Sequence, residues 1–273
     1  ALLAGDIAIA FGPQLVRFAD SGPIATGFWR LALATPFLLA VGYRFGFRMS
    51  TVSRSTLWLI IVAGVFFGVD IVLWHIGIFQ TKMANATIFA NCASLLLVVY
   101  GVIGARKMPS RWEGAAILFA FLGAALLMGQ SLELSPRHFT GDLLSLGAGL
   151  TYTVYLVSMI KVRQNTESWG ALGMASAFAA VVLLACALFA GEQIIPTEWW
   201  PVVLLAFTSQ FFGQGCLTYA LPHFNPLVIG LALLLQPALS AAAGWLAFGE
   251  TLTAMDFTGS ALVMLALVLV RKQ

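Results

Sequence analysis

The protein has 273 residues, of which 60% are hydrophobic and 9% are charged, whereas a soluble globular domain carries about 25% charged residues. Its mean hydropathy is +0.95, and its formal net charge of +3 is too small for a nucleic-acid-binding surface. The composition therefore excludes a water-soluble domain and indicates a polytopic membrane protein.

Long apolar runs alternate with short polar breaks along the whole chain. A helix needs about 20 predominantly apolar residues to cross the hydrocarbon core of a bilayer, so each run is counted as one span. We predict ten membrane-spanning helices, in chain order Ala1–Phe18, Gly22–Gly42, Thr56–Phe79, Lys82–Ala105, Arg111–Gly129, Gly141–Lys161, Ser168–Ala190, Glu198–Leu221, Asn225–Gly249 and Ala254–Val270. Because the connections are short, we expect the function to reside within the helical bundle.

Most of the basic residues fall on one side of the predicted membrane. Assigning the loops to alternate sides places ten Lys and Arg residues on one side and three on the other. The ten are Arg44, Arg48, Arg54, Arg106, Lys107, Arg111, Lys161, Arg163, Arg271 and Lys272, and the three are Arg17, Lys82 and Arg137. Since Lys and Arg concentrate in cytoplasmic loops, we predict that both termini lie in the cytoplasm.

The chain resembles itself at an offset of 145 residues, where Val62–Leu122 aligns with Phe207–Leu267 without a gap. In this alignment the few polar and aromatic residues of one segment align with residues of the same chemical type in the other. The matched pairs are Trp74 with Tyr219, Gln80 with Asn225, Asn91 with Gln236 and Tyr100 with Trp245. Such internal similarity in a membrane protein is typical of a carrier built from two structural repeats.

Ten spans divide into five and five, and an odd number of spans in each half makes the halves antiparallel in the bilayer. We therefore predict an all-α polytopic membrane protein, with ten transmembrane helices arranged as two inverted five-helix repeats around a central cavity. The first repeat covers residues 1–133 and the second covers residues 134–273.

Four ionisable side chains are predicted to lie inside spans, where a charge costs about 2.5 to 3.5 kcal/mol on insertion scales. Asp70 has two open interpretations: a cavity residue that recognises a cation or amine or carries protons, and a structural ion pair with Arg30. For His75 we weigh a proton relay against a neutral ring that bonds a neighbouring helix. Asp6 lies early in the first span, so we expect it to be a hydrated or capping residue near the cytoplasmic surface.

Uncharged polar side chains and aromatic rings in matching spans of the two halves predict a shared central site. Asp70 and Trp74 are four residues apart and share a helix face. Pro237 follows Gln236 directly, and a bend there would turn carbonyl groups toward the cavity. The candidate substrate-binding residues are Asp70, Trp74, His75, Asn85, Asn91, Tyr155, Gln214, Tyr219 and Gln236.

The sequence contains no catalytic or phosphate-binding motif of familiar spacing. Its cysteines, Cys92, Cys186 and Cys216, lie in apolar spans without a metal-type or paired spacing. We expect no enzyme activity, no metal and no cofactor. The membrane-embedded enzyme that we weigh as an alternative would have to use Asp70 and His75.

Several short strings resemble the EamA-type carriers of the drug/metabolite transporter superfamily, over essentially the whole chain. They are Asn225-Pro226 at the start of a helix, Gln236-Pro237-Ala238 in its middle, Gly249-Glu250-Thr251-Leu252-Thr253 at its end, and Gly259 in the next helix. The first half departs from this pattern, since Cys92 stands where the second half has Pro237 and Ala105-Arg106 stands where it has Gly249-Glu250. We therefore expect the bend to be asymmetric, in the second half.

Within this superfamily the chain is most similar to bacterial exporters of aromatic amino acids, which also move the dication methyl viologen. The resemblance implies a transporter of the bacterial inner membrane that exports aromatic amino acids and similar amphipathic metabolites or drugs by alternating access. Asp70 and His75 are the candidates for coupling to protons, and the sequence leaves proton antiport and facilitated diffusion both open. We expect no nucleic-acid partner, and we expect a monomer in the lipid bilayer to suffice. The alternative within the superfamily, a nucleotide-sugar or sugar-phosphate exchanger, calls for buried basic residues, and only Arg30 is available for that role.

Overall fold

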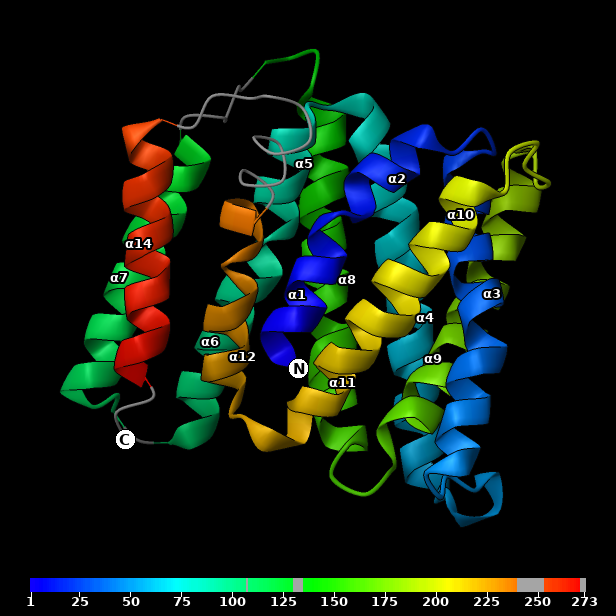
Figure 1. The fold of residues 1–273 in the computed structure, drawn as a ribbon, viewed down its shortest axis with the longest axis horizontal. Helices are drawn as coiled ribbons and strands as arrows, with labels where there is room; N and C mark the ends of the chain where they lie inside the picture. The colour runs from blue at the N-terminus through cyan, green and yellow to red at the C-terminus, as the bar shows by residue number, and fades with distance from the viewer. Residues whose placement is uncertain (107, 130–134, 240–252, 271–273) are drawn as a thin grey trace.

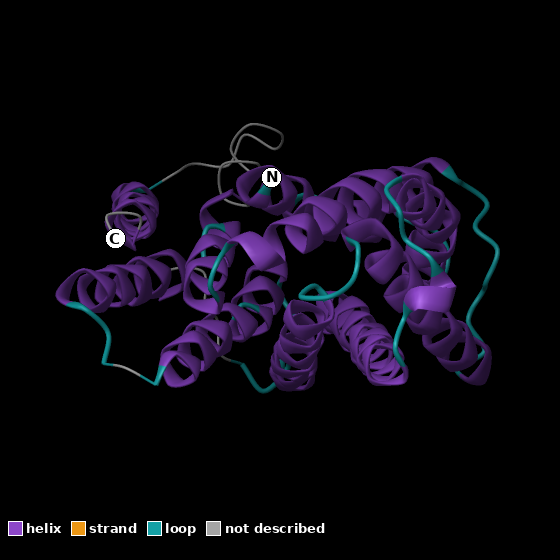
Figure 2. Ribbon diagram, turned by 90° about the horizontal axis from the view of Figure 1, so that it is seen from below, coloured by secondary structure: helices purple, strands orange, loops and turns teal. Residues whose placement is uncertain are grey.

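The computed structural model describes residues 1–106, 108–129, 135–239 and 253–270. These residues form helices, turns and short loops, and no strand occurs among them. The helices lie side by side in a bundle (Figure 1), and Figure 2 shows most of them nearly end-on. The predicted boundary between residues 133 and 134 lies outside the described residues, as do Lys107, Trp245, the string from Gly249 to Leu252, and the basic pair Arg271-Lys272.

Five described helices are long and apolar enough to cross a membrane. They are α3 (Pro23–Arg44), α4 (Arg54–Gln80), the segment Asn85–Ala105, α8 (Phe139–Val162) and α9 (Ser168–Phe189). Two shorter apolar segments, Pro226–Leu239 and Phe257–Val270, follow later in the chain. The helix α7 (Arg111–Gly129) has the bounds predicted from the sequence. The protein is thus an all-helical membrane protein in the part of the chain that the structure describes.

Four predicted spans are interrupted helices. The first consists of α1 (Leu2–Ala10) and α2 (Gly12–Phe18), and the fourth consists of α5 (Met83–Ala90) and α6 (Cys92–Ala105), with Asn91 at the break. The eighth runs from α10 (Trp200–Leu205) through a π-helix (η2, Ala206–Gln214) into α11 (Gly215–Ala220). In the ninth, α12 (Pro226–Leu233) ends at a turn of residues 234–235, just before Gln236.

The asymmetric bend predicted from Pro237 is therefore wrong, because both matched spans break. The break in the first half contains no proline, and polar side chains bond one another and the backbone around it. The amide of Asn91 donates a hydrogen bond to the Thr87 carbonyl at 2.9 Å, and the Ser94 hydroxyl donates to the Asn91 side-chain oxygen at 3.4 Å. Irregular backbone at membrane depth is tolerated only where such partners or a cavity are present.

The bundle has two large hydrophobic clusters, and α6 and α12 contribute buried residues to both. Around one cluster α4 packs against α8 and α9, and α3 packs against α9. Around the other, α6 packs against α12, and α7 packs against α14 (Ala254–Val270). The segment α1 crosses η2 and lies between these two groups of helices (Figure 1).

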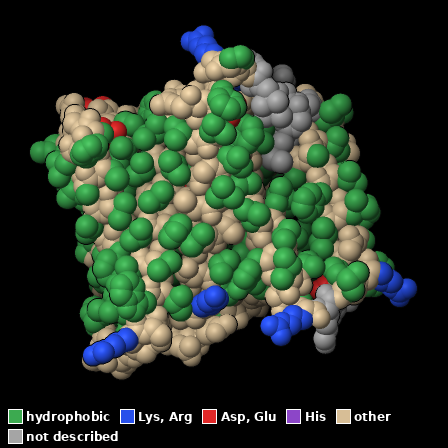
Figure 3. Space-filling model, turned by 180° about the vertical axis from the view of Figure 1, so that it is seen from behind, with side chains coloured by type: hydrophobic (Ala, Val, Ile, Leu, Met, Phe, Trp, Pro, Cys, Tyr) green, Lys and Arg blue, Asp and Glu red, His purple; other side chains and the backbone are tan. Residues whose placement is uncertain are grey.

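The outer surface is apolar over the middle of the bundle. Figure 3 shows hydrophobic side chains across this face, with the visible Lys and Arg side chains toward its edges. Apolar residues from the middle of helices, such as Val181 of α9 and Leu118 of α7, are 67% and 57% exposed, respectively. Such a band is suited to lipid, where exposed apolar area carries no cost in water structure.

Close approach of α4 and α9 depends on the small face formed by Gly64 and Gly68. A Cβ atom added to Gly64 would lie 2.6 Å from the carbonyl oxygen of Ala175 and 2.6 Å from the Cβ of Phe178. Gly64→Ala is therefore expected to destabilise the fold by about 1–3 kcal/mol, the usual cost of overpacking. Thermal unfolding of the purified protein in detergent measures this effect. Gly104→Ala is the matched control, since a Cβ at Gly104 meets nothing within 4 Å, and equal melting of both variants would contradict the prediction.

Candidate functional site

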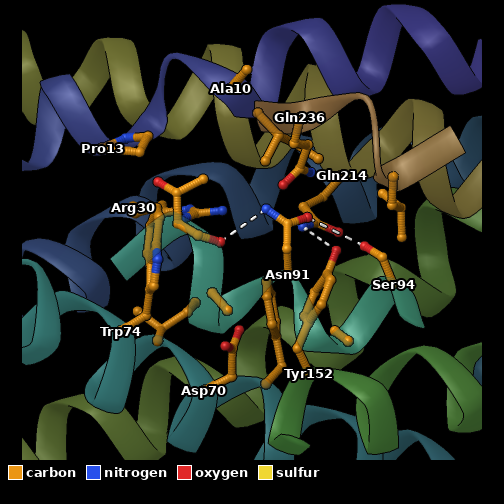
Figure 4. Close-up of a pocket in the computed structure, with 17 residues that line it drawn as sticks. Ala10, Pro13, Arg30, Asp70, Trp74, Asn91, Ser94, Tyr152, Gln214 and Gln236 are labelled. Atoms are coloured by element: carbon orange, nitrogen blue, oxygen red, sulfur yellow. Dashed lines mark hydrogen bonds between the residues drawn. The ribbon is translucent and has the colours of Figure 1, made fainter. Parts of the chain in front are cut away.

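A cavity of about 90 Å³ lies inside the bundle, where the interrupted helices meet. By the same measure of volume one water molecule needs at least roughly 10–15 Å³, so there is room for several waters or a small polar solute. Its walls are formed by Ile9, Ala10, Pro13, Arg30, Phe67, Asp70, Ile71, Trp74, Thr87, Ala90, Asn91, Ala93, Ser94, Tyr152, Gln214, Leu233 and Gln236. Figure 4 shows these side chains around the cavity.

The position of the cavity follows from the helix breaks. Ala10 and Pro13 flank the break between α1 and α2, Asn91 is the break between α5 and α6, and Gln214 ends the π-helix. Gln236 directly follows the turn after α12. Interrupted helices of membrane carriers line their central sites in this way, because the cavity supplies partners for the freed backbone groups.

Two opposite charges line the cavity. Arg30 comes from α3 and is 3% exposed, and its Nε–H has no hydrogen-bond partner among the described residues. Asp70 comes from α4 and is half-buried. The described part of the chain contains no ion pair within 4.0 Å between these two groups, so the structure does not form the direct Asp70–Arg30 pair that the sequence left open.

Gln214 is held by two tyrosines of α8. Its side-chain nitrogen donates to the hydroxyl of Tyr152 at 3.1 Å, and its side-chain oxygen accepts from the hydroxyl of Tyr155 at 3.4 Å. The ring of Tyr155 stacks on Phe67 at a centroid distance of 4.4 Å. The two tyrosines therefore fix the orientation of the Gln214 amide at the cavity wall.

Five of the nine candidate residues line the cavity: Asp70, Trp74, Asn91, Gln214 and Gln236. The other four, His75, Asn85, Tyr155 and Tyr219, do not belong to its walls. Tyr155 lies directly behind the wall, where it contacts Gln214. Tyr219 fits the expected role least, because its side chain is 49% exposed on α11 and its ring packs near that of His223.

His75 and Asn85 are both fully buried and bond to neighbouring helices. The Nδ1 of His75 lies 2.8 Å from the carbonyl oxygen of Pro23, so Nδ1 carries the proton and the ring is neutral as long as Nε2 is unprotonated. This is the second of the two interpretations weighed for His75. The amide of Asn85 donates to a carboxylate oxygen of Asp142 at 3.1 Å, and the Thr81 hydroxyl donates to the same oxygen at 2.6 Å.

Asp6 differs from its prediction. It is 1% exposed, so the expectation of a hydrated residue near the surface is wrong. The physical reason is close packing of α1 on the π-helix: a Cβ at Gly5 would lie 2.7 Å from the carbonyl oxygen of Gly213. Gln236 lies near the Asp6 carboxyl group, but neither oxygen of Asp6 has a hydrogen-bond partner among the described residues.

Twelve of the wall residues are absent from the sequence-based set, and Phe67, Thr87 and Ser94 are three of them. Thr87 and Ser94 lie four residues before and three residues after Asn91, so they share its helical face. That spacing around a buried amide was the available signal. Phe67 gave none, because an apolar aromatic residue in an apolar helix does not reveal which way it faces. The described residues contain no group of three or more His, Cys, Asp or Glu that could hold a metal.

Comparison with known proteins adds the family. The sequence pattern of the EamA-like transporter family matches residues 2–129 and 139–272. The chain belongs to the EamA-like transporter family.

Two curated proteins that are similar in sequence to this chain are bacterial exporters. The pseudopaline exporter CntI of Pseudomonas aeruginosa is 21% identical over 245 residues, which cover 88% of this chain and 83% of CntI. The threonine/homoserine exporter RhtA of Escherichia coli is 27% identical over 235 residues, which cover 82% of this chain and 73% of RhtA. A crystal structure with a TM-score of 0.79 at 16% identity, covering 98% of this chain and 94% of the other, has the same fold.

Proposed function

We propose that this EamA-family transporter exports amino acids and related amphipathic metabolites by alternating access of the central cavity. The observation that carries the proposal is the cavity itself, which lies at the breaks of several helices and combines aromatic walls with three amides and two opposite charges. The two relatives are named as exporters of threonine/homoserine and of pseudopaline, which favours a small polar metabolite as cargo.

The contacts between helices support two inverted halves, residues 1–133 and 134–273, of five spans each. The proposed repeat relates α4 to the segment containing η2, α8 to the segment containing α1, and α3 to α9. α4 packs against α8 as η2 packs against α1, and α4 packs against α9 as η2 packs against α3. In Figure 1, α3 runs toward the lower end of the bundle and α9 runs toward the upper end. Paired contacts and opposite directions fit a two-fold axis in the membrane plane.

The rings of Phe67, Trp74 and Tyr152 give the cavity flat walls, and this favours the aromatic amino acids that the sequence suggests. Aromatic side chains stack on such rings in offset or edge-to-face geometry, with a gain of about 0.5–1.5 kcal/mol beyond burial. A nucleotide sugar or sugar phosphate fits less well, because its negative charge would meet Asp70 as well as Arg30. The excess of basic residues in one set of loops supports insertion in a bacterial inner membrane with both termini in the cytoplasm.

Transport by purified protein in proteoliposomes tests the function. We expect saturable counterflow of labelled phenylalanine, tryptophan, threonine or homoserine, and at least a tenfold loss of flux in Gln236→Ala at unchanged folded yield. A pH gradient of either sign, imposed in a parallel experiment, reports proton coupling. Protein-free liposomes give the background. Absence of carrier-dependent flux for all four amino acids would refute the proposed function.

A further inference from the structure

We propose that Arg30 and Asp70 recognise the two charged groups that free α-amino acids share, with Arg30 binding the α-carboxylate and Asp70 binding the α-ammonium group. The inference rests on the proposed function and names its substrate class as zwitterions. The side chain of the solute would then lie along Trp74, which is one helical turn from Asp70.

The first step of the argument is that both charges face the same small space. The described cavity walls contain two side chains of the types Asp, Glu, Lys and Arg, and these are Arg30 from α3 and Asp70 from α4. Asp6, which is also buried nearby, is not a wall residue and so does not contact a solute in the cavity. Any solute in this space therefore meets one guanidinium group and one carboxylate group.

The second step is that Arg30 and Asp70 attract each other from a distance without forming a direct ion pair. A direct ion pair would satisfy them, but none is present within 4.0 Å in the described part of the chain. A buried charge without a partner is costly, and the cost falls when an opposite charge with hydrogen-bonding capacity arrives. Two separated, unpaired charges of opposite sign are the electrostatic complement of a zwitterion.

The third step concerns the donors of Arg30. A guanidinium group carries five N–H donors and binds carboxylates in a bidentate geometry. Within the described residues Arg30 makes no hydrogen bond, and its buried Nε–H is explicitly without an acceptor. Figure 4 shows Arg30 and Asp70 at separate positions on the wall, with Trp74 also facing the cavity. A carboxylate of the solute supplies the acceptor that Arg30 lacks.

Competition by analogues on the unaltered protein tests the inference without any risk of misfolding. The measurement is inhibition of labelled phenylalanine counterflow by unlabelled phenylalanine, by phenethylamine, which lacks the carboxylate, and by 3-phenylpropionate, which lacks the ammonium group. We expect each analogue to compete at least tenfold less well than phenylalanine. Threonine and homoserine carry the same ammonium and carboxylate groups as phenylalanine, so we expect these groups to bind in the same way. If phenylalanine is not carried, labelled threonine is tested against threoninol and 3-hydroxybutyrate in the same way.

Two variants assign the groups. Arg30→Gln should reduce at least fivefold the ratio by which phenylalanine inhibits counterflow better than phenethylamine does. Asp70→Asn should reduce at least fivefold the corresponding ratio for phenylalanine and 3-phenylpropionate. A purely structural role of either residue would lower flux without changing these ratios, and that result would overturn the assignment. Arg54→Gln, which removes an exposed arginine, should leave all ratios unchanged.

The failures of the two proposals are distinguishable. Carrier-dependent flux of amino acids that the decarboxylated and deaminated analogues inhibit equally well would overturn the zwitterion site and leave the exporter intact. Absence of flux for every amino acid would overturn both.

Discussion

Replacing Trp74 by alanine is expected to raise the KM for aromatic amino acid transport about 10- to 100-fold. Trp74 is half-buried, and its indole packs beside the apolar cluster of Leu15, Val16 and Ile78 while facing the cavity. A lost aromatic contact together with lost apolar burial amounts to about 1.5–3 kcal/mol of binding free energy, which corresponds to that range of affinity. Initial rates of counterflow at varied phenylalanine concentration give KM and the maximal rate separately.

Two companion variants make this result specific. Trp58→Ala removes an indole that is 67% exposed on the outer surface, so its KM should match that of the unaltered protein. Trp74→Phe keeps a ring at the cavity and should recover most of the lost affinity. A KM for Trp74→Ala equal to that of Trp58→Ala would mean that the solute does not bind beside Trp74.

Asp142→Leu is expected to destabilise the protein by about 3 kcal/mol. The Asp142 carboxylate is 6% exposed and accepts hydrogen bonds from the Thr81 hydroxyl and the Asn85 amide, both of which are buried. Leucine leaves both donors without this acceptor, and each buried unsatisfied donor costs about 1–3 kcal/mol. Thermal unfolding in detergent, monitored by intrinsic fluorescence, measures the loss.

Asp142→Asn serves as the conservative control, because both donors bond the same carboxylate oxygen and an amide oxygen in that place accepts both, so its loss should be much smaller than that of Asp142→Leu. Asn85→Ala tests the same cluster from the other side. It should lower thermal stability with little change in KM, whereas a raised KM at unchanged stability would return Asn85 to the set of substrate-binding residues.

The sequence predicts the membrane helices well, since their length and apolarity are local properties. The bounds predicted for α7 and for the start of α9 match the structure, and those of α3, α4 and α8 differ by at most two residues at either end. The helix breaks were harder to predict. Pro237 signalled one of them, whereas Asn91 lies at the other, where its side chain bonds the Thr87 carbonyl. Asparagine side chains compete with helical hydrogen bonds, but an asparagine alone does not fix where a helix breaks.

The residues of the site were predicted only in part, because the protein is surrounded by lipid and not by water. In a bilayer the outer face of a helix is as apolar as its packed face, so apolar periodicity does not tell which side chains point inward. Asp70, Trp74 and Gln236 reach the cavity, whereas Tyr219 of the same matched set is half exposed on α11. An ionisable side chain cannot face lipid, but this alone does not place it at the cavity: Arg30 and Asp70 line it, whereas Asp6 and His75 are buried elsewhere.

The opposite signs of Arg30 and Asp70 have an electrical consequence. Moving one elementary charge through a membrane potential of 100 mV changes its free energy by about 2.3 kcal/mol. A cavity that holds one charge of each sign, loaded with a solute that adds none, moves no net charge when it opens to the other side, and neither does the empty cavity on its return. Without a coupled proton, the membrane potential then neither drives nor opposes export, whereas a dication such as methyl viologen would have to leave a cell of negative interior against twice that energy.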